Sequence, residues 1–197
     1  GFIAQGMARA SGQAAVCLAS SGPGATNLIT AIADARLDSI PIVCITGQVP
    51  SAMIGTDAFQ EVDTYGLTVP VTKHNFLVDH VGDLLDVVPR AFRIALSGRP
   101  GPVLIDVPKD IQTATIEFDT WPEPGRADAA PQPADAALAA AAALIAQARR
   151  PILYLGGGVV HAAAAPLART LAETAGLPTV STLMALGALP ETHALHL

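Results

Sequence analysis

Short apolar runs bounded by glycine or proline alternate along this chain with stretches of helical periodicity. Each run is rich in Val, Ile and Leu, which is typical of a strand buried in a parallel sheet. The first 107 residues contain four such runs: Ala14–Ala19, Pro41–Thr46, Phe76–Val78 and Pro102–Val107. The predicted helices between them are Phe2–Ala10, Ala25–Arg36 and Asp83–Leu96, the last bent or split by Pro89. The alternation predicts an α/β fold, with a parallel sheet flanked by helices.

A proline-rich stretch from Trp121 to Pro133 separates this part from a second α/β unit. In the second unit, Asp135 is expected to cap an alanine-rich helix that ends near Ala148. After it we expect strand Pro151–Leu155, a tight turn at Gly156–Gly158, helix Pro166–Ala175 and strand Pro178–Thr182. The predicted domains are residues 1–112 and 135–197, with a linker at 113–134. Two strands are too few to close such a domain, so we expect a truncated C-terminus. The chain starts at Gly1 without an initiator Met, so we expect its natural beginning to be missing as well.

Composition excludes several classes of function. Hydrophobic residues make up 51% of the 197, and the formal charge of −6 with only 11 Lys and Arg argues against nucleic acid binding. The longest apolar run, Ala136–Ala146, is shorter than the roughly 20 residues that a membrane helix needs. No signal peptide is recognisable, so we expect a cytoplasmic protein. Cys17 and Cys44 lie in apolar runs and are expected to be buried free thiols.

A glycine-rich turn, Ser20–Asn27 (SSGPGATN), joins the first predicted strand to the next helix. Gly22 and Gly24 allow a sharp turn and close approach to a ligand, and the helix N-terminus favours negative charge there. The same residues also suit a plain strand-to-helix turn. The Lys of a Walker loop is missing, which argues against a P-loop nucleotide site.

A long polar loop follows the second strand, at the same edge of the sheet. It runs from Thr46 to Asp63 and contains Phe59 and Gln60, residue types that suit a site shielding a small molecule. A surface loop with Phe59 tucked into the core explains the pattern equally well. Lys109, at the end of another strand, and Arg99 are either contacts for an anion or solvated surface residues.

The remaining sequence patterns do not indicate a particular function. The turn Gly156–Gly158 follows a strand, but His161 stands where a Rossmann motif needs glycine. The five histidines show no metal-ligand spacing, and no G-x-S-x-G elbow is present. From the residues alone, the chain is a small-molecule-binding α/β protein.

Taken in order, five stretches resemble the large catalytic subunits of acetolactate synthase (acetohydroxyacid synthase), a family of thiamine diphosphate enzymes. The stretches are Ser20–Pro50, Gly55–Asp63 (GTDAFQEVD), Val71–Val78 (VTKHNFLV), Ser97–Gln112 and Leu153–Val159. SGPGATN occurs across the wider thiamine enzyme superfamily, whereas GTDAFQEVD with TKHNF is much narrower. The resemblance covers nearly the whole chain except the linker. It implies the later part of a pyrimidine-binding domain and the beginning of a middle, FAD-contacting domain.

The resemblance also implies roles for individual residues. Positions that contact thiamine diphosphate match Ser20, Pro23, Asn27 and Gln60. The substrate channel is implied at Phe59, Gln60 and Lys109, and the herbicide-binding channel mouth at Pro50 and Ala58. Positions that hold FAD match Arg99, Gly156, Gly157, Gly158, Thr182 and Leu183. The catalytic candidates are therefore Gln60, Phe59 and Lys109, and no metal ligand is expected within this chain.

Two parts of the family pattern are absent. The glutamate that activates the cofactor's aminopyrimidine lies upstream of the matching segment, and no Gly-Asp-Gly motif for Mg²⁺ and diphosphate occurs here. We therefore expect these 197 residues alone to be inactive.

The activity that the resemblance implies is condensation of two pyruvates, or of pyruvate and 2-oxobutyrate, with loss of CO₂. A homodimer or tetramer and a small regulatory subunit are implied partners. The alternatives are a sister carboligase or decarboxylase, such as one acting on glyoxylate, and a non-catalytic binding remnant.

Overall fold

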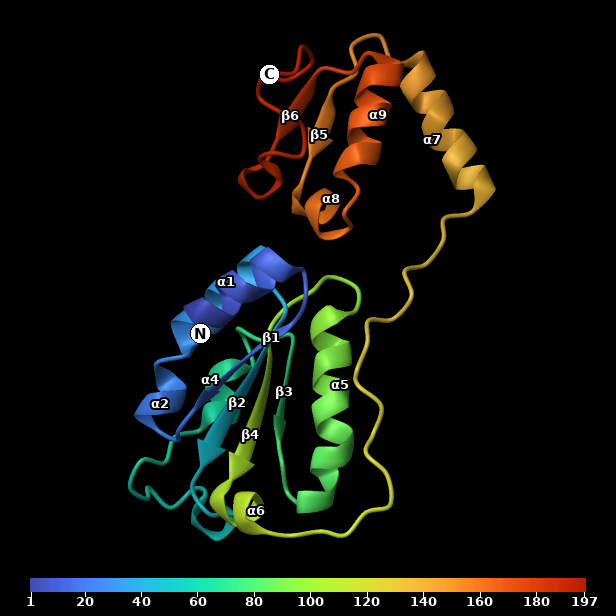
Figure 1. Ribbon diagram of the computed structural model, residues 1–197. Coiled ribbons are helices and arrows are strands. Elements are labelled where there is room, and N and C mark those ends of the chain that lie inside the picture. The colour runs from blue at the N-terminus through green and yellow to red at the C-terminus, as the bar shows by residue number, and fades with distance from the viewer. The chain divides into compact units, whose positions relative to one another are not determined.

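A computed structural model describes all 197 residues, which form two units, Gly1–Ala130 and Pro131–Leu197 (Figure 1). The boundary falls inside the proline-rich stretch. Each unit is described by itself below.

The first unit is built on a four-stranded parallel sheet, which confirms the predicted fold class. The strands are β1 (Ala15–Ala19), β2 (Ile42–Gln48), β3 (His74–Leu77) and β4 (Val103–Pro108), in the spatial order β1-β2-β4-β3. In this register Cys17 lies opposite Cys44, and Thr46 lies opposite Asp106. Because all four strands run the same way, their carboxyl ends meet at one edge.

Helices cover both faces of the sheet (Figure 1). Helices α1 (Phe2–Ser11) and α3 (Ile29–Asp38) bury Ala4, Ala8, Ile32 and Ala35 against one face, together with Ile42, Cys44 and Leu104. Helix α5 (Leu84–Leu96) packs Ala91 and Ala95 against Val43, Val103 and Ile105 on the other face. Successive strand residues thus face opposite layers, as the pleat requires. Three short helices remain: α2 (Pro23–Thr26), α4 (Thr64–Thr68) and α6 (Lys109–Thr113).

One helix prediction in this unit was wrong in detail, and one of the two alternatives for Pro89 is excluded. The predicted helix Ala25–Arg36 is divided into α2 and α3, because the Leu28 N–H donates to the carbonyl of Ala25, three residues back, and tightens the turn. Pro89 does not split α5, although its ring nitrogen donates no hydrogen bond. Burial of the helix's apolar face against the sheet offsets that loss.

The two cysteines are free and adjacent on β1 and β2, with their Sγ atoms 3.3 Å apart. Cys44 is buried as predicted, whereas Cys17 is only half-buried. The hydrogen bond with Cys44 lowers the pKa of the Cys17 thiol to about 7. The same contact, together with burial, raises the pKa of Cys44.

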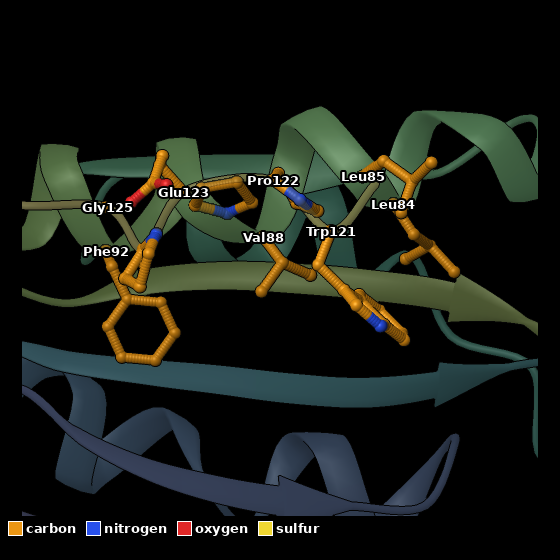
Figure 2. A pocket seen from close by; sticks show the side chains of 10 residues that line it. Leu84, Leu85, Val88, Phe92, Trp121, Pro122, Glu123 and Gly125 are labelled. Carbon is orange, nitrogen blue, oxygen red and sulfur yellow. The ribbon is translucent and has the colours of Figure 1, made fainter. Parts of the chain in front are cut away.

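Part of the proline-rich stretch, which was predicted to be a linker, packs along α5. Trp121, Pro122 and Gly125 face Val88 and Phe92 across an apolar pocket of about 480 Å³ (Figure 2). Further along, the Asp128 carboxylate pairs with Arg93 at 2.7 Å, and the Asp128 N–H donates to the Ser97 hydroxyl. A Cβ at Gly125 would overlap the carbonyl oxygen of Pro89, so only glycine allows this close an approach.

Replacing Gly125 with alanine should therefore lift the segment from α5. We expect a change in the fluorescence of Trp121, the single tryptophan, and roughly tenfold faster proteolysis between residues 119 and 130. The control is Gly6→Ala in α1, where an added Cβ meets nothing within 4 Å. Unchanged fluorescence and proteolysis in Gly125→Ala would show that the segment does not depend on this contact.

The second unit contains a two-stranded parallel sheet of β5 (Leu153–Leu155) and β6 (Thr179–Ser181). Its helices are α7 (Asp135–Gln147), α8 (Gly157–His161) and α9 (Ala165–Ala175). The predicted turn at Gly156–Gly158 is instead the start of α8, with Gly156 in extended conformation before it. Asp135 does not cap α7: Ala134 occupies that position, and Asp135 lies in the first turn.

No helix in the structure combines the length and apolar character needed to cross a membrane.

Candidate functional site

The two polar loops singled out by the sequence meet at the carboxyl edge of the first unit's sheet. Ser20–Asn27 follows β1, the loop from Val49 to Asp63 follows β2, and Lys109 follows β4. The ends of neighbouring parallel strands are where ligands bind in open α/β sheets.

Gly22 and Gln60 bring the two loops into contact. Gly22 is buried with φ of +57°, and a Cβ built on it would lie 2.7 Å from the carbonyl oxygen of Gln60. Gln60 itself has φ of +60°, which is uncommon outside glycine. Within the first loop, a Cβ built on Gly24 would meet the Ser20 hydroxyl. Glycine at position 22 is thus required for the two loops to close on each other.

Several exposed side chains surround this contact. Ser20, Pro23 and Asn27 are exposed on the first loop, and Phe59 and Gln60 are exposed on the second. Phe59 has 88% of its surface accessible, so the alternative of a core Phe59 is wrong. A large exposed aromatic beside polar groups is typical of a surface that a ligand or partner covers.

The tip of the second loop is folded around the Glu61 carboxylate. The N–H groups of Gly55, Thr56 and Ala58 donate to its two oxygens, the last two at 3.1 Å. These bonds hold the pKa of Glu61 below its usual range. Glu61 thereby shapes the turn that presents Phe59 and Gln60.

The base of the same loop rests on a buried polar cluster. Asp106, 1% exposed on β4, accepts hydrogen bonds from Thr46 Oγ1 at 2.7 Å and Gln48 Nε2 at 3.1 Å. Burial raises the pKa of Asp106 to about 6, and the nearby charge of Asp63 adds to the shift. Asp106 and Gln48 line a cavity of about 270 Å³ between the loop and the strand ends.

Lys109 opens α6 and is exposed. The next residue, Asp110, accepts from the Ser51 N–H at 2.9 Å and from its hydroxyl at 3.1 Å. This fixes the start of α6 beside Pro50, so the structure brings Lys109 to the same edge as the two loops.

Arg99 lies elsewhere. It precedes β4, at the amino edge of the sheet, where its guanidinium donates to Ser39 Oγ at 2.6 Å and to the Leu37 carbonyl at 3.0 Å. Within the first unit, the structure does not bring Arg99 together with the other site residues.

In the second unit, the residues singled out for FAD lie together at the carboxyl ends of β5 and β6. The Thr182 N–H donates to the Leu155 carbonyl at 2.8 Å, and a Cβ at Gly157 would lie 3.0 Å from Met184. Leu183 is exposed, and Gly156 and Gly158 each face open space. A ligand can therefore approach the backbone closely at both glycines.

Sequence reasoning missed the supporting residues Gln48, Glu61 and Asp106. Asp106 left one signal, since it is a carboxylate inside the apolar run Val103–Val107. No group of three or more His, Cys, Asp or Glu side chains in the 197 residues is arranged to hold a metal ion.

Comparison with protein families gives two matches. Residues 1–67 match the N-terminal TPP binding domain of the thiamine pyrophosphate enzymes, and residues 138–197 match the central domain of the same enzymes. The first match contains both loops of the candidate site, and the second contains the β5 and β6 ends.

Among individual relatives, the large subunit of acetolactate synthase isozyme 1 from Escherichia coli K12 is 64% identical over 197 residues, covering all of this chain. The Corynebacterium glutamicum acetolactate synthase large subunit is 51% identical over all of it, and acetolactate synthase 3, chloroplastic, from Brassica napus is 50% identical over 96%. The matched region is 35%, 32% and 29% of those relatives, so the chain spans about a third of their length.

Proposed function

This chain belongs to the thiamine pyrophosphate enzymes, and we propose that it serves as part of an acetolactate synthase large subunit. The reaction is the condensation of two pyruvates, or of pyruvate with 2-oxobutyrate, to 2-acetohydroxy acids with loss of CO₂, in branched-chain amino-acid biosynthesis. The observation that carries the proposal is the contact of Gly22 with Gln60, which joins the two loops that bear the site residues. The 64% identity to a relative of that name supports it.

The residues at this edge fit the pyrimidine end of thiamine diphosphate. Ser20, Asn27 and Gln60 offer a hydroxyl and two amides on exposed positions around a glycine backbone, and Pro23 adds an apolar surface. Such a mixture of a few polar groups with apolar contact suits a heteroaromatic ring. When bound, the cofactor supplies the carbon nucleophile and the electron sink for decarboxylation. We propose that Ser20, Pro23 and Asn27 hold the ring and that Gln60 orients the substrate.

We propose that the exposed Phe59 ring shields the reacting centre from water and that Lys109 attracts the substrate carboxylate. The Mg²⁺ that accompanies the cofactor's diphosphate has no candidate ligands in these 197 residues, so we assign it no residue here. Pro50, beside Ser51, and Ala58, on the Phe59 loop, are proposed for the mouth of the same channel.

Replacing Lys109 with methionine should raise the KM for pyruvate about tenfold in the full-length enzyme and leave the fold intact. The side chain is exposed and makes no ion pair in the structure, so its loss costs little stability. The difference from wild type should shrink at high salt, because salt screens the attraction. Lys109→Arg, which keeps the charge, is the matched control. An unchanged KM in Lys109→Met would remove Lys109 from the substrate's path.

For FAD, we propose a site formed by Gly156, Gly157, Gly158, Thr182 and Leu183. Support comes from the open backbone at Gly156 and Gly158 and from the adjacency of the two strand ends. The Arg99 guanidinium donates two of its five N–H groups to Ser39 and Leu37, so three donors remain for the FAD contact that we propose for Arg99.

We also propose that the full enzyme is a homodimer or tetramer, and that it pairs with a small regulatory subunit. The second proposal is supported by the words "large subunit" in the names of the relatives from Escherichia coli and Corynebacterium glutamicum.

The decisive experiment is an assay of the full-length protein with thiamine diphosphate, Mg²⁺ and FAD. We expect formation of 2-acetolactate from pyruvate that depends on thiamine diphosphate, and a second product when 2-oxobutyrate is added. Turnover of glyoxylate in preference to pyruvate would favour a sister carboligase. Absence of any carboligation or decarboxylation would overturn the proposal.

A further inference from the structure

We propose that Asp106 is a positioning residue that acts through Gln48 to hold the loop bearing Phe59 and Gln60. The inference rests on the proposed function for what Gln60 does, but the hold on the loop is a property of this chain alone.

The connection begins at a buried carboxylate. Asp106 Oδ1 accepts from Thr46 Oγ1 at 2.7 Å and Oδ2 accepts from Gln48 Nε2 at 3.1 Å. Thr46 is the register partner of Asp106, and both are completely or almost completely buried. Each carboxylate oxygen thus has a donor from β2.

Gln48 carries the connection to the loop. Its Nε2 also donates to the carbonyl of Val62 at 2.9 Å, and its Oε1 accepts from the Val49 N–H at 2.8 Å. Val49 is the first residue of the loop and Val62 follows Gln60 by two residues, so one side chain holds both ends. The amide cannot flip, because a flip would aim Oε1 at two acceptors.

The carboxylate is costly to the fold. Beside Asp106, the loop contributes Glu61 and Asp63, and α4 contributes Tyr65. Strands β2 and β3 contribute only Thr46, Gln48 and Leu77. No Lys, Arg or His lines this cavity. Burial raises the pKa of Asp106 from 3.8 to about 6. A carboxyl whose pKa rises on folding favours the folded state when protonated, and this stabilisation is lost as the pH rises from about 4 to about 6.

At neutral pH the ionised Asp106 therefore lowers stability. A neutral residue that kept both hydrogen bonds would remove this cost. The contact on which the loop depends is the acceptor that Asp106 supplies to Gln48.

The test compares Asp106→Leu and Asp106→Asn in the full-length protein. Leucine removes the acceptor, and we expect amide exchange in residues 50–62 to become about tenfold faster and kcat to fall about tenfold. The protein should stay folded at the assay temperature, because removal of the buried charge offsets the cost of leaving the Thr46 hydroxyl without a partner. Asparagine can turn its oxygen toward Gln48 and its amide toward Thr46, so it should restore both loop exchange and kcat. Asp86→Leu, at an exposed aspartate on α5, is the matched control and should change neither.

A second readout isolates the carboxylate. The melting temperature of Asp106→Asn relative to wild type should rise between pH 4 and pH 7, because only wild type ionises there. The proposal would be overturned if amide exchange in residues 50–62 of Asp106→Leu were as slow as in wild type. A fall in kcat that merely follows a lower melting temperature would overturn it as well. Loop exchange is measured without substrate, so faster exchange in a protein lacking acetolactate activity would count against the proposed function and not against this hold.

Discussion

Replacing Gly22 with alanine should lower the kcat of the full-length enzyme by about 100-fold or more. The added Cβ would lie 2.7 Å from the Gln60 carbonyl oxygen and 2.9 Å from its Cα, and these backbone atoms cannot rotate away. Gly22 also has φ of +57° with ψ of −116°, a conformation that strains alanine by about 1–3 kcal/mol. The two loops would separate, and the groups that they carry would no longer converge.

Gly12→Ala is the matched control for the strain. Gly12 has φ of +69°, but an added Cβ there meets nothing within 4 Å. We expect it to cost about 1 kcal/mol of stability without a change in turnover. Circular dichroism melting and steady-state kinetics on the full-length protein separate the two effects. Equal losses of turnover in both variants would mean that backbone strain, and not loop contact, limits the reaction.

Gln60→Ala should cut kcat by about 100-fold while the loop keeps its shape. The Gln60 side chain is exposed and makes no hydrogen bond in the structure, so its removal breaks no contact of the fold. The expected loss comes from the missing amide at the reacting centre. Steady-state kinetics with pyruvate measure the loss of catalysis, and the melting temperature shows whether the fold is retained.

Two further variants control for the backbone and the residue type. Gln60→Gly also lacks the amide but relieves the positive φ of +60°, so it should be as slow as Gln60→Ala. Gln13→Ala, at an exposed glutamine before β1, should behave like wild type. Recovery of turnover in Gln60→Gly would assign the defect to strain and remove the amide from the mechanism.

The layered fold could be predicted because its signal is local. Apolar runs such as Val103–Val107 are buried on both faces of the sheet. In the segments between these runs, apolar residues recur at helical spacing. The adjacency of the two loops also followed, since parallel strands place their carboxyl ends at one edge. The resemblance singled out Gln60 and Lys109, and the structure places both at that edge.

What could not be predicted depends on contacts between residues far apart in sequence. The approach of Gly125 to Pro89 turns a proline-rich segment into a partner of α5, and composition alone suggests only a linker. The hydrogen bond from Gln48 to Asp106 joins residues 58 positions apart. The break between α2 and α3 is set by one tightened hydrogen bond at Leu28, which leaves no periodic trace.

Strand β1 lies at the edge of the sheet, and this position affects how readily the chain aggregates. One side of β1 carries unpaired backbone groups, and Leu18 on its surface is 74% exposed. An apolar strand edge of this kind templates pairing with another extended chain. Light scattering by concentrated solutions of the 197-residue chain should therefore fall when Leu18 is replaced by lysine, a charge that such edges commonly carry in nature. In the 197-residue chain, the strand that leads into the glycine-rich loop is thus also the place from which precipitation would begin.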